Sequence, residues 1–321
     1  MLHVRPFVKG VDEPIWVEIL NAAYKEHEAW WRATTVEEML LEEKRPNFDF
    51  EGRHIAELDG KPVGIVHAHV DKLRKEKKGF IFTFCVIPEF RGLGVEEKLA
   101  ETAINELKKR GMKVVQTWTD YKRTDRIQLL KELGFKAVRS ESDMEIDLTN
   151  IPSKIGENAE IVIRTLWKNV EEDIKLLNWL NNECFKDHFN YRPSTLEETR
   201  HHLLSDTRIK QKEYFFAALD RETIGYIGVG IDEKYNIEKN VKNGFILSIG
   251  VLKPYRRKGI GTSLMLQGLK SLEARGMTKA MLDVDDLNPT KAIRLYERIG
   301  FQVVKKYQFW EKPLCAHISD A

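Results

Sequence analysis

The sequence predicts an α/β (α+β) protein made of two tandem copies of one fold. Three observations support this prediction: a length of 321 residues, an internal repeat, and the same alternation of strand-like and helix-like segments in each half. A chain of this length usually forms two domains, and its 42% hydrophobic content is enough for two cores. We expect domains at residues 1–148 and 160–321, with a linker at 149–159 that contains Pro152 and Gly156.

The repeat consists of matched segments at a nearly constant spacing. Residues 79–86 correspond to residues 244–251, an offset of 165 (244 − 79), and both segments begin with Gly-Phe-Ile. Arg91 and Gly94 match Arg256 and Gly259 at the same offset. Such agreement along the chain indicates two homologous domains.

The first part of each half reads as a strand, two helices and a hairpin. Apolar residues at helical spacing predict the helices, and short apolar runs around Asp59-Gly60 and around residues 220–222 predict the hairpins. The expected ranges are 3–7, 14–25, 35–44, 55–58 and 63–70 in the first half, and 161–165, 171–185, 195–204, 215–219 and 224–231 in the second.

The second part of each half begins with an apolar fourth strand, at 79–86 and 244–251. A glycine turn then leads into a long helix, a fifth strand, a last helix that ends in Gly-Phe, and a final strand. The expected long helices are 95–110 and 261–275, and the expected fifth strands are 114–119 and 280–285.

The turn that follows the fourth strand of the second half is basic and rich in glycine. It contains Arg256, Arg257, Lys258, Gly259 and Gly261. Glycines permit a tight turn, and the helix that starts there presents unpaired N–H groups and the positive end of its dipole. Such a turn binds an anion, most often phosphate. The alternative is an ordinary glycine turn whose basic side chains are solvated.

This turn resembles the Arg/Gln-x-x-Gly-x-Gly/Ala signature of the GNAT superfamily of acetyl-CoA-dependent N-acetyltransferases, with Arg256, Gly259 and Gly261 at the fixed positions. The order of elements is also similar to the GNAT fold. The resemblance implies two tandem GNAT folds, each a mixed, mostly antiparallel sheet flanked by helices, in an arrangement similar to mycothiol synthase. It also implies that coenzyme A is bound by Ile249, Gly250, Val251, Arg256, Arg257, Lys258, Gly259, Ile260, Gly261, Thr262, Asn288 and Tyr296.

The two copies differ at the positions that matter for this chemistry. Glu96 stands where the second copy has Gly261, and Leu130 stands where it has Tyr296. An acid at the turn repels phosphate by about 1–4 kcal/mol, although it also favours a helix N-terminus. We therefore expect a catalytic C-terminal domain, and a degenerate N-terminal domain that shapes the acceptor cleft.

The resemblance assigns roles to two residues of the last helix region. The Tyr296 hydroxyl would protonate the departing thiolate, the alternative being a half-buried core aromatic. Asn288 would cap the helix that follows it and contact the cofactor.

The general base stays open at this stage. Many GNAT enzymes carry a glutamate on strand four, but residues 244–251 contain no carboxylate. Asp283 and Asp285, which share one face of strand five, are candidates, and so is His188, whose free pKa lies nearest neutrality. Each has a structural alternative as a polar strand-end or loop residue.

The predicted activity is acetyl transfer from acetyl-CoA to a primary amine of a small molecule or peptide N-terminus by direct attack. Backbone N–H groups of residues 249–251 would stabilise the oxyanion. Residues 184–193 would line the acceptor cleft, and residues 24–31 would form an interdomain contact or pack at a helix end. The alternatives are a non-catalytic acyl-CoA-binding or sensor protein and a nucleotide-binding module of another class.

Bulk composition restricts the partners. The net charge of +2 gives no global field that would recruit nucleic acid or an anionic membrane, and the basic run 72–78 reads as a solvated hairpin. Three scattered cysteines argue against a disulfide framework and a zinc site. Neither a signal-peptide core nor a membrane span is visible, so we expect a cytoplasmic protein. We also expect no bound metal, and a monomer or homodimer.

Overall fold

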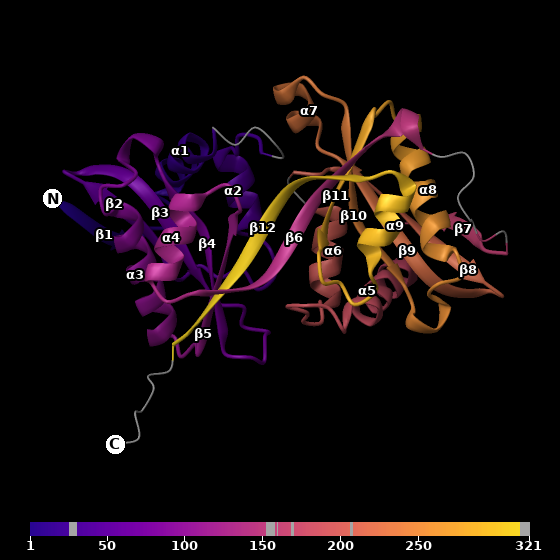
Figure 1. The fold of residues 1–321 in the computed structure, drawn as a ribbon, viewed down its shortest axis with the longest axis horizontal. Helices are drawn as coiled ribbons and strands as arrows, with labels where there is room; N and C mark the ends of the chain where they lie inside the picture. Colours follow the sequence, from indigo (N-terminus) through magenta and orange to yellow (C-terminus); the bar gives the residue numbers. More distant parts are fainter. Residues whose placement is uncertain (26–30, 152–157, 159, 168–169, 206–207, 315–321) are drawn as a thin grey trace, which may run out of the picture. The chain divides into compact units, whose positions relative to one another are not determined.

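The computed structural model describes residues 1–25, 31–151, 158, 160–167, 170–205 and 208–314. In these residues the chain forms two compact units, drawn as a ribbon in Figure 1. Unit 1 comprises Met1–Arg139 and Tyr307–Ala321, and unit 2 comprises Ser140–Lys306.

Unit 1 contains a mixed sheet in the order β1-β2-β3-β4-β5-β12. Strands β4 and β5 pair in parallel, and the other neighbours pair antiparallel. Its elements are β1 (Leu2–Pro6), α1 (Glu13–Tyr24), α2 (Val36–Glu42), β2 (Arg53–Leu58), β3 (Lys61–His69), β4 (Lys78–Val86), η1 (Pro88–Phe90), α3 (Val95–Lys109), β5 (Val114–Asp120), α4 (Thr124–Glu132) and the second part of β12 (Gln302–Pro313).

Unit 2 repeats this design in the order β7-β8-β9-β10-β11-β6. Here β10 and β11 are the parallel pair. Its elements are most of β6 (Lys136–Asp147), η2 (Leu148–Asn150), β7 (Val162–Thr165), α5 (Glu171–Phe185), α6 (Leu196–Leu204), β8 (Gln211–Leu219), β9 (Glu222–Ile231), α7 (Glu233–Lys239), β10 (Asn243–Val251), η3 (Lys253–Tyr255), α8 (Ile260–Ala274), β11 (Lys279–Asp285), α9 (Ala292–Ile299) and the start of β12.

The predicted repeat is confirmed by these bounds. The pairs β4 and β10, α3 and α8, and β5 and β11 each begin and end 165 residues apart. A mixed, mostly antiparallel sheet flanked by helices in each unit confirms the predicted fold class. The α7 helix, between β9 and β10, was not predicted.

The final strand of each half pairs with the sheet of the other half. In β6, Glu141–Asp147 pair antiparallel with β11 of unit 2. In β12, Tyr307–Pro313 pair with β5 of unit 1. The two halves thus exchange their last strands, and the compact units differ from the expected boundaries of 1–148 and 160–321. The expected linker 149–159 lies largely outside the described residues, as do residues 26–30 of the expected interdomain contact.

Helices cover both faces of each sheet because side chains alternate along the strands. In unit 1, Ile55 and Ile65 pack against α1, whereas Ala56 and Val66, one residue further along, share a core with α3. In unit 2, Phe216 packs with α5, and its neighbour Ala217 shares the core of α8. This arrangement leaves the end of the sheet, between α5, α8 and α9, as the place where a ligand can reach the strands.

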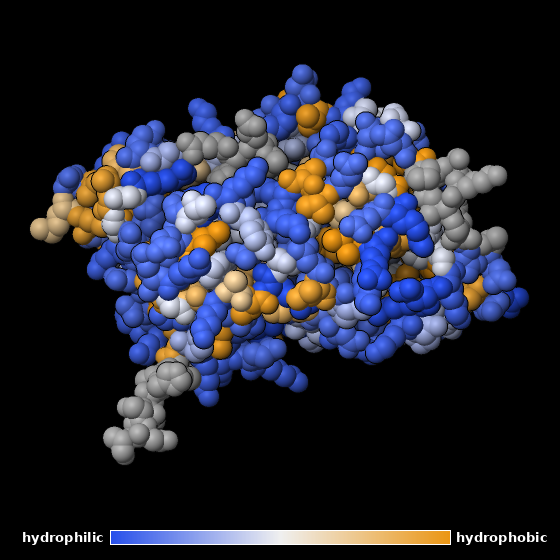
Figure 2. All heavy atoms as spheres, viewed as in Figure 1, coloured by the Kyte–Doolittle hydropathy of each residue, from blue (hydrophilic) through white to orange (hydrophobic). Residues whose placement is uncertain are grey.

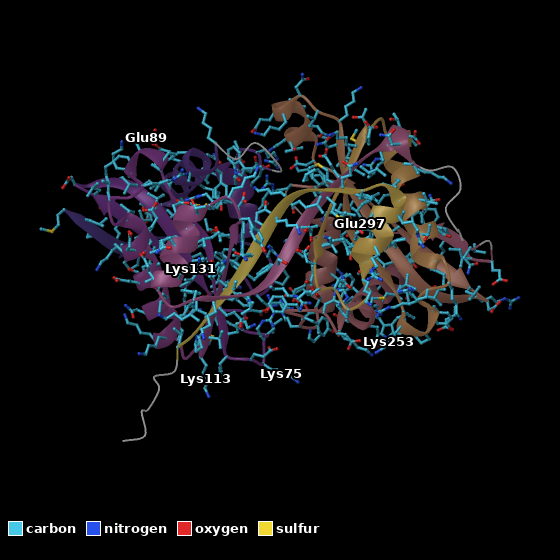
Figure 3. The ribbon with its side chains drawn as sticks, in the orientation of Figure 1. Lys75, Glu89, Lys113, Lys131, Lys253 and Glu297 are labelled. Atoms are coloured by element: carbon cyan, nitrogen blue, oxygen red, sulfur yellow. The ribbon has the colours of Figure 1, made fainter. Side chains whose placement is uncertain are left out.

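The face of the molecule drawn in Figure 2 is mainly polar. Figure 2 shows hydrophilic residues over most of the visible face, interrupted by small apolar groups. The loop between β3 and β4 is exposed at Lys72 and Lys75, and Figure 3 labels Lys75. None of the described helices combines the length and apolar composition that a bilayer crossing requires.

Candidate active site

A cavity of about 760 Å³ lies in unit 2 where β10 and β11 separate. Parallel pairing joins Asn243–Phe245 to Lys279–Met281, and the residues that follow on both strands line the cavity. A register shift between Ile246 and Ser248 marks a bulge in the ladder that joins β10 to β9. Bulges bend a strand locally, which accounts for the opening at this point.

One side of the cavity is the glycine turn that precedes α8. Gly259 is the N-cap of α8, with φ of 80°, and no side chain caps the helix. Arg257 also has a positive φ, of 66°, at the position where unit 1 has Gly92. A left-handed arginine costs about 1–2 kcal/mol, and such strain is typical of functional turns. The uncapped N–H groups of a 15-residue helix make this end of the cavity suitable for an anion.

The Arg256 side chain stabilises the turn through two hydrogen bonds to backbone carbonyls. Its Nε donates to the Val251 carbonyl at 2.9 Å and its Nη2 donates to the Cys184 carbonyl at 2.9 Å. Arg91 makes the same two contacts in unit 1, with the carbonyls of Val86 and Ala23. The fixed arginine of the signature therefore ties the end of the fourth strand to the first long helix in both copies.

Further cations line the same end of the cavity, and the sequence reasoning did not single them out. Arg294 and Arg298, four residues apart, lie on one face of α9, and Lys291 precedes them as the N-cap of that helix. Arg298 Nη2 donates to Thr262 Oγ1 at 3.2 Å, which places it at the first turn of α8. Lys253, labelled in Figure 3, lies at the rim with its Nζ 3.5 Å from Asp187 Oδ2.

Another part of the cavity lining, which we call the acidic wall, consists of Glu141, Asp283 and Asp285 on two paired strands. Asp285 faces Glu141 and Asp283 faces Asp143 in the antiparallel ladder between β11 and β6. Burial, together with the negative charge of Asp283 and a hydrogen bond to it, raises the pKa of Glu141 to about 8. A carboxyl group with this pKa takes up and releases protons near neutral pH.

The sequence did not indicate Glu141 as a site residue, because β6 belongs to the first half of the chain. The available signal was the alternation of acids at Glu141, Asp143 and Glu145, which a strand directs to one face. The sequence did not show that this strand pairs with β11.

Tyr296 reaches the cavity from α9 and is 6% exposed. Burial and the nearby Asp283 raise the pKa of its hydroxyl above the ordinary value, so the phenol stays protonated. The Cys184 thiol also lines the cavity, and burial raises its pKa to about 12. A thiol in this state is a poor nucleophile, because the thiolate is the reactive form.

Asn288 lines the cavity but does not cap α9, which corrects the expectation for this residue. Its Oδ1 accepts from Thr290 N at 2.8 Å and from Thr290 Oγ1, closing a turn two residues long. The N-cap of α9 is Lys291, with φ of 57° and no side-chain cap. The loop after β11 therefore continues past Asn288 to Lys291 before α9 begins.

The cavity therefore brings together most of the predicted residues. Its lining includes the four predicted catalytic residues, Tyr296, Asp283, Asp285 and His188, as well as the predicted binding residues Ile249, Gly250, Val251, Arg256, Arg257, Gly259, Gly261, Thr262 and Asn288. Two predicted binding residues lie outside this lining. The Lys258 Nζ lies over the Tyr255 ring, 5.6 Å from its centroid, and Ile260 is a core residue.

Unit 1 has a different arrangement at the equivalent place. Arg126, which corresponds to the cavity-lining Ala292, is buried, and its Nη2 donates to the Phe84 carbonyl at 2.8 Å. Its guanidinium carbon lies 3.6 Å from the centroid of the Phe84 ring. Glu96 is also buried, at 8% exposure. An arginine thus packs against the strand where unit 2 has its cavity, and an acid stands at the turn.

Comparison with known proteins gives consistent matches. Residues 16–135 and 174–301 match the family described as "Acetyltransferase (GNAT) family". A mycothiol acetyltransferase of Thermomonospora curvata is 29% identical over 135 residues, 41% of this chain and 43% of that protein. An N-alpha-acetyltransferase of Sulfurisphaera tokodaii is 38% identical over 97 residues, 29% of this chain and 58% of that protein.

Both alignments span less than two thirds of these relatives. A solved tandem GNAT protein from the clavulanic acid biosynthesis pathway covers 98% of this chain and 99% of its own, with a TM-score of 0.75 and 14% identity. At this identity the likeness concerns the fold.

Proposed function

Because the chain belongs to the GNAT family of acetyltransferases, we propose that unit 2 transfers the acetyl group of acetyl-CoA to a primary amine on a small molecule or a peptide N-terminus. The observation that carries this proposal is one cavity whose lining includes the glycine turn before α8, the acidic wall and Tyr296. N-acetyl transfer needs these three parts: a phosphate site, a proton acceptor and a proton donor.

The diphosphate of coenzyme A would bind the N–H groups at the start of α8, with Arg257 and the α9 cations around it. The fit rests on the uncapped helix start and on the two positive-φ residues, Arg257 and Gly259, that form the turn.

The end of β10 offers N–H donors for the oxyanion. Leu252 N donates to Ile224 O of β9 at 2.9 Å. Because successive N–H groups of a strand point in opposite directions, those of Ile249 and Val251 point away from β9, toward the β11 side. These two N–H groups are the proposed oxyanion donors.

Glu141 is the proposed general base, with the acidic wall attracting the ammonium form of the acceptor. The ammonium gives one proton to Glu141, and the neutral amine attacks the thioester carbonyl. The C–N bond forms, the C–S bond breaks, and the nitrogen loses its second proton. Tyr296 donates a proton to the departing sulfur and is restored by the second proton from the nitrogen, so the net products are the amide, the free thiol and the one proton held by Glu141. The neutral Cys184 thiol favours direct attack over an acyl-cysteine intermediate.

The proposal is tested by measuring acetyl-CoA-dependent thiol release with a panel of primary amines and peptides with free N-termini. We expect release with at least one class and, by mass spectrometry, acetylation of its amine. No turnover across the panel, together with no coenzyme A binding by calorimetry, would overturn the proposal.

Tyr296→Phe should lower kcat by about 10²-fold or more, because it removes the proton donor while keeping the ring in place. The dissociation constant for coenzyme A should stay unchanged. Tyr235→Phe, which alters a buried tyrosine of α7 outside the cavity, is the matched control. Thiol release at the wild-type rate in Tyr296→Phe would show that the phenol only packs in the core.

A further inference from the structure

Three metal-binding side chains converge in unit 1, apart from the proposed active site of unit 2. They are Asp49, in the segment before β2, and His67 and His69 on β3. The two histidines are two residues apart on a strand and therefore lie on the same face. One ligand atom from each residue lies within 4.8 Å of the others. Asp49 Oδ2 is 3.9 Å from His67 Nε2 and 3.8 Å from His69 Nδ1.

The orientation of His67 points to a missing partner. Its Nε2 is buried and has no hydrogen-bond partner among the described residues. The Glu51 backbone carbonyl is the backbone acceptor that interacts with the imidazole, and the unpartnered Nε2 leaves Nδ1 as the nitrogen that faces it. A histidine that binds a metal almost always donates its second N–H to a carbonyl or carboxylate, which fixes the tautomer and aims the free lone pair at the ion. His67 resembles such a ligand, with a backbone carbonyl acting on the ring and a buried Nε2 that has no hydrogen-bond partner among the described residues.

Asp49 is fully buried and held in position by its own partners. Arg110 donates to Oδ1 at 2.8 Å and to Oδ2 at 2.9 Å, and Val70 N donates to Oδ2 at 2.7 Å. These contacts orient the carboxylate toward the two imidazoles. The guanidinium also offsets the charge of Asp49, so we expect an ion here to dissociate more readily than from a structural zinc site.

The pair of histidines is specific to the first copy of the repeat. At an offset of 161, which aligns Gly64 with Gly225, His67 and His69 correspond to Gly228 and Gly230. The space beside these glycines in unit 2 is filled by the Tyr214 ring and by Ile209. In the C-terminal copy, packing side chains therefore occupy the space that the two imidazoles occupy in the first copy.

We propose that Asp49, His67 and His69 bind one divalent transition-metal ion, of which Zn²⁺ is the best match. Two imidazoles and one carboxylate favour zinc-like ions over Mg²⁺ and Ca²⁺, which prefer oxygen ligands. Zinc ligands lie about 2.0–2.2 Å from the ion and therefore about 3.4 Å from one another in a tetrahedral site, so the donor atoms must draw together by about half an ångström or more. His69 is partly exposed and its ring lies 5.2 Å from that of the exposed Phe82, which gives the ion a route from solvent.

The test uses the full-length chain after dialysis against a chelator. Zn²⁺ binding is measured by isothermal titration calorimetry, and Co²⁺ binding by visible absorption, which reports the ligand field directly. We expect one ion per chain, and a loss of affinity of more than about 10-fold in both His67→Gln and His69→Gln. His54→Gln, on the neighbouring strand β2, is the matched control and should bind as the wild type does.

Circular dichroism establishes that each variant is folded. His69→Gln is the variant least prone to misfold, because His69 is partly exposed. No Zn²⁺ binding by the wild type would overturn the proposal. Binding that survives in a folded His69→Gln chain, or that is lost equally in His54→Gln, would also overturn it, because the ion would then bind elsewhere. The measurement needs no acetyltransferase activity, so its outcome is independent of the proposed function.

Discussion

Glu141→Gln should lower kcat by about 10²–10⁴-fold, the contribution typical of general base catalysis, while leaving coenzyme A binding unchanged. Glutamine keeps the size and hydrogen-bonding ability of the side chain but cannot accept the proton of the amine. Glu145→Gln is the matched control, because this residue lies on the same strand and is ion-paired with Lys279 outside the cavity lining. A Glu141→Gln enzyme with wild-type kcat would require another base, with Asp283 and Asp285 as the remaining carboxylates.

The pH dependence of kcat/KM provides a second test of Glu141 as the general base. The pKa of Glu141 is raised to about 8, so the base form grows as pH increases through this value. In the wild type, kcat/KM should therefore rise about tenfold per pH unit below pH 8 and level off above it. In Glu141→Gln this rise of kcat/KM with pH should be absent. Any pH dependence that stays would then come from ionisation of the amine substrate. The assay uses an acceptor of known pKa, so that the two ionisations can be separated.

Stability provides an independent check on the same residue. A carboxyl group whose pKa is raised by folding is protonated more readily in the folded state than in the unfolded chain. Its ionisation therefore lowers the free energy of unfolding as pH rises from the unfolded pKa, near 4.5, through about 8. Glu141→Gln removes this loss and should be more stable than the wild type above pH 8. A catalytic defect in a more stable protein cannot be assigned to unfolding.

Local patterns were enough to predict most of the fold. The repeat, the hairpin turns and the helical spacing are properties of short segments, and the structure confirms them within a few residues. The partner of β6 is not a local property, because β6 and β12 are both final strands that follow equivalent helices. Each could complete either sheet with the same alternation of side chains. The exchange of these strands, and with it Glu141, could therefore be found only in the structure.

The candidate site was predictable to the extent that it depends on the backbone of one turn. The glycine turn before α8 and the phenol of Tyr296 lie on one continuous stretch, and both line the cavity. Arg256 and Asn288 matched a family signature, yet their side chains bond to the protein: Arg256 to two carbonyls and Asn288 to Thr290. A signature indicates which positions are constrained, but it does not separate contacts with ligand from contacts that shape the turn.

Gly261→Glu should weaken coenzyme A binding by about 5- to 1,000-fold, because it places at the turn of unit 2 the acid that unit 1 carries as Glu96. The range corresponds to a like-charge repulsion of about 1–4 kcal/mol between the carboxylate and the diphosphate. A Cβ at position 261 would lie 3.3 Å from Leu295 Cδ2, so part of the effect is steric. Gly261→Gln has nearly the same volume without the charge and separates the two causes. The difference between these variants should shrink as ionic strength rises.

The stoichiometry of coenzyme A binding completes this test of the asymmetry between the copies. We expect one molecule per chain by isothermal titration calorimetry. In unit 1, Arg126 packs against Phe84 of β4, and Glu96 lies at the turn where the diphosphate would bind. Glu96→Gly alone should add no second site, since the buried guanidinium remains. Two molecules per wild-type chain, or an unchanged affinity in Gly261→Glu, would mean that the diphosphate does not depend on the open turn of unit 2.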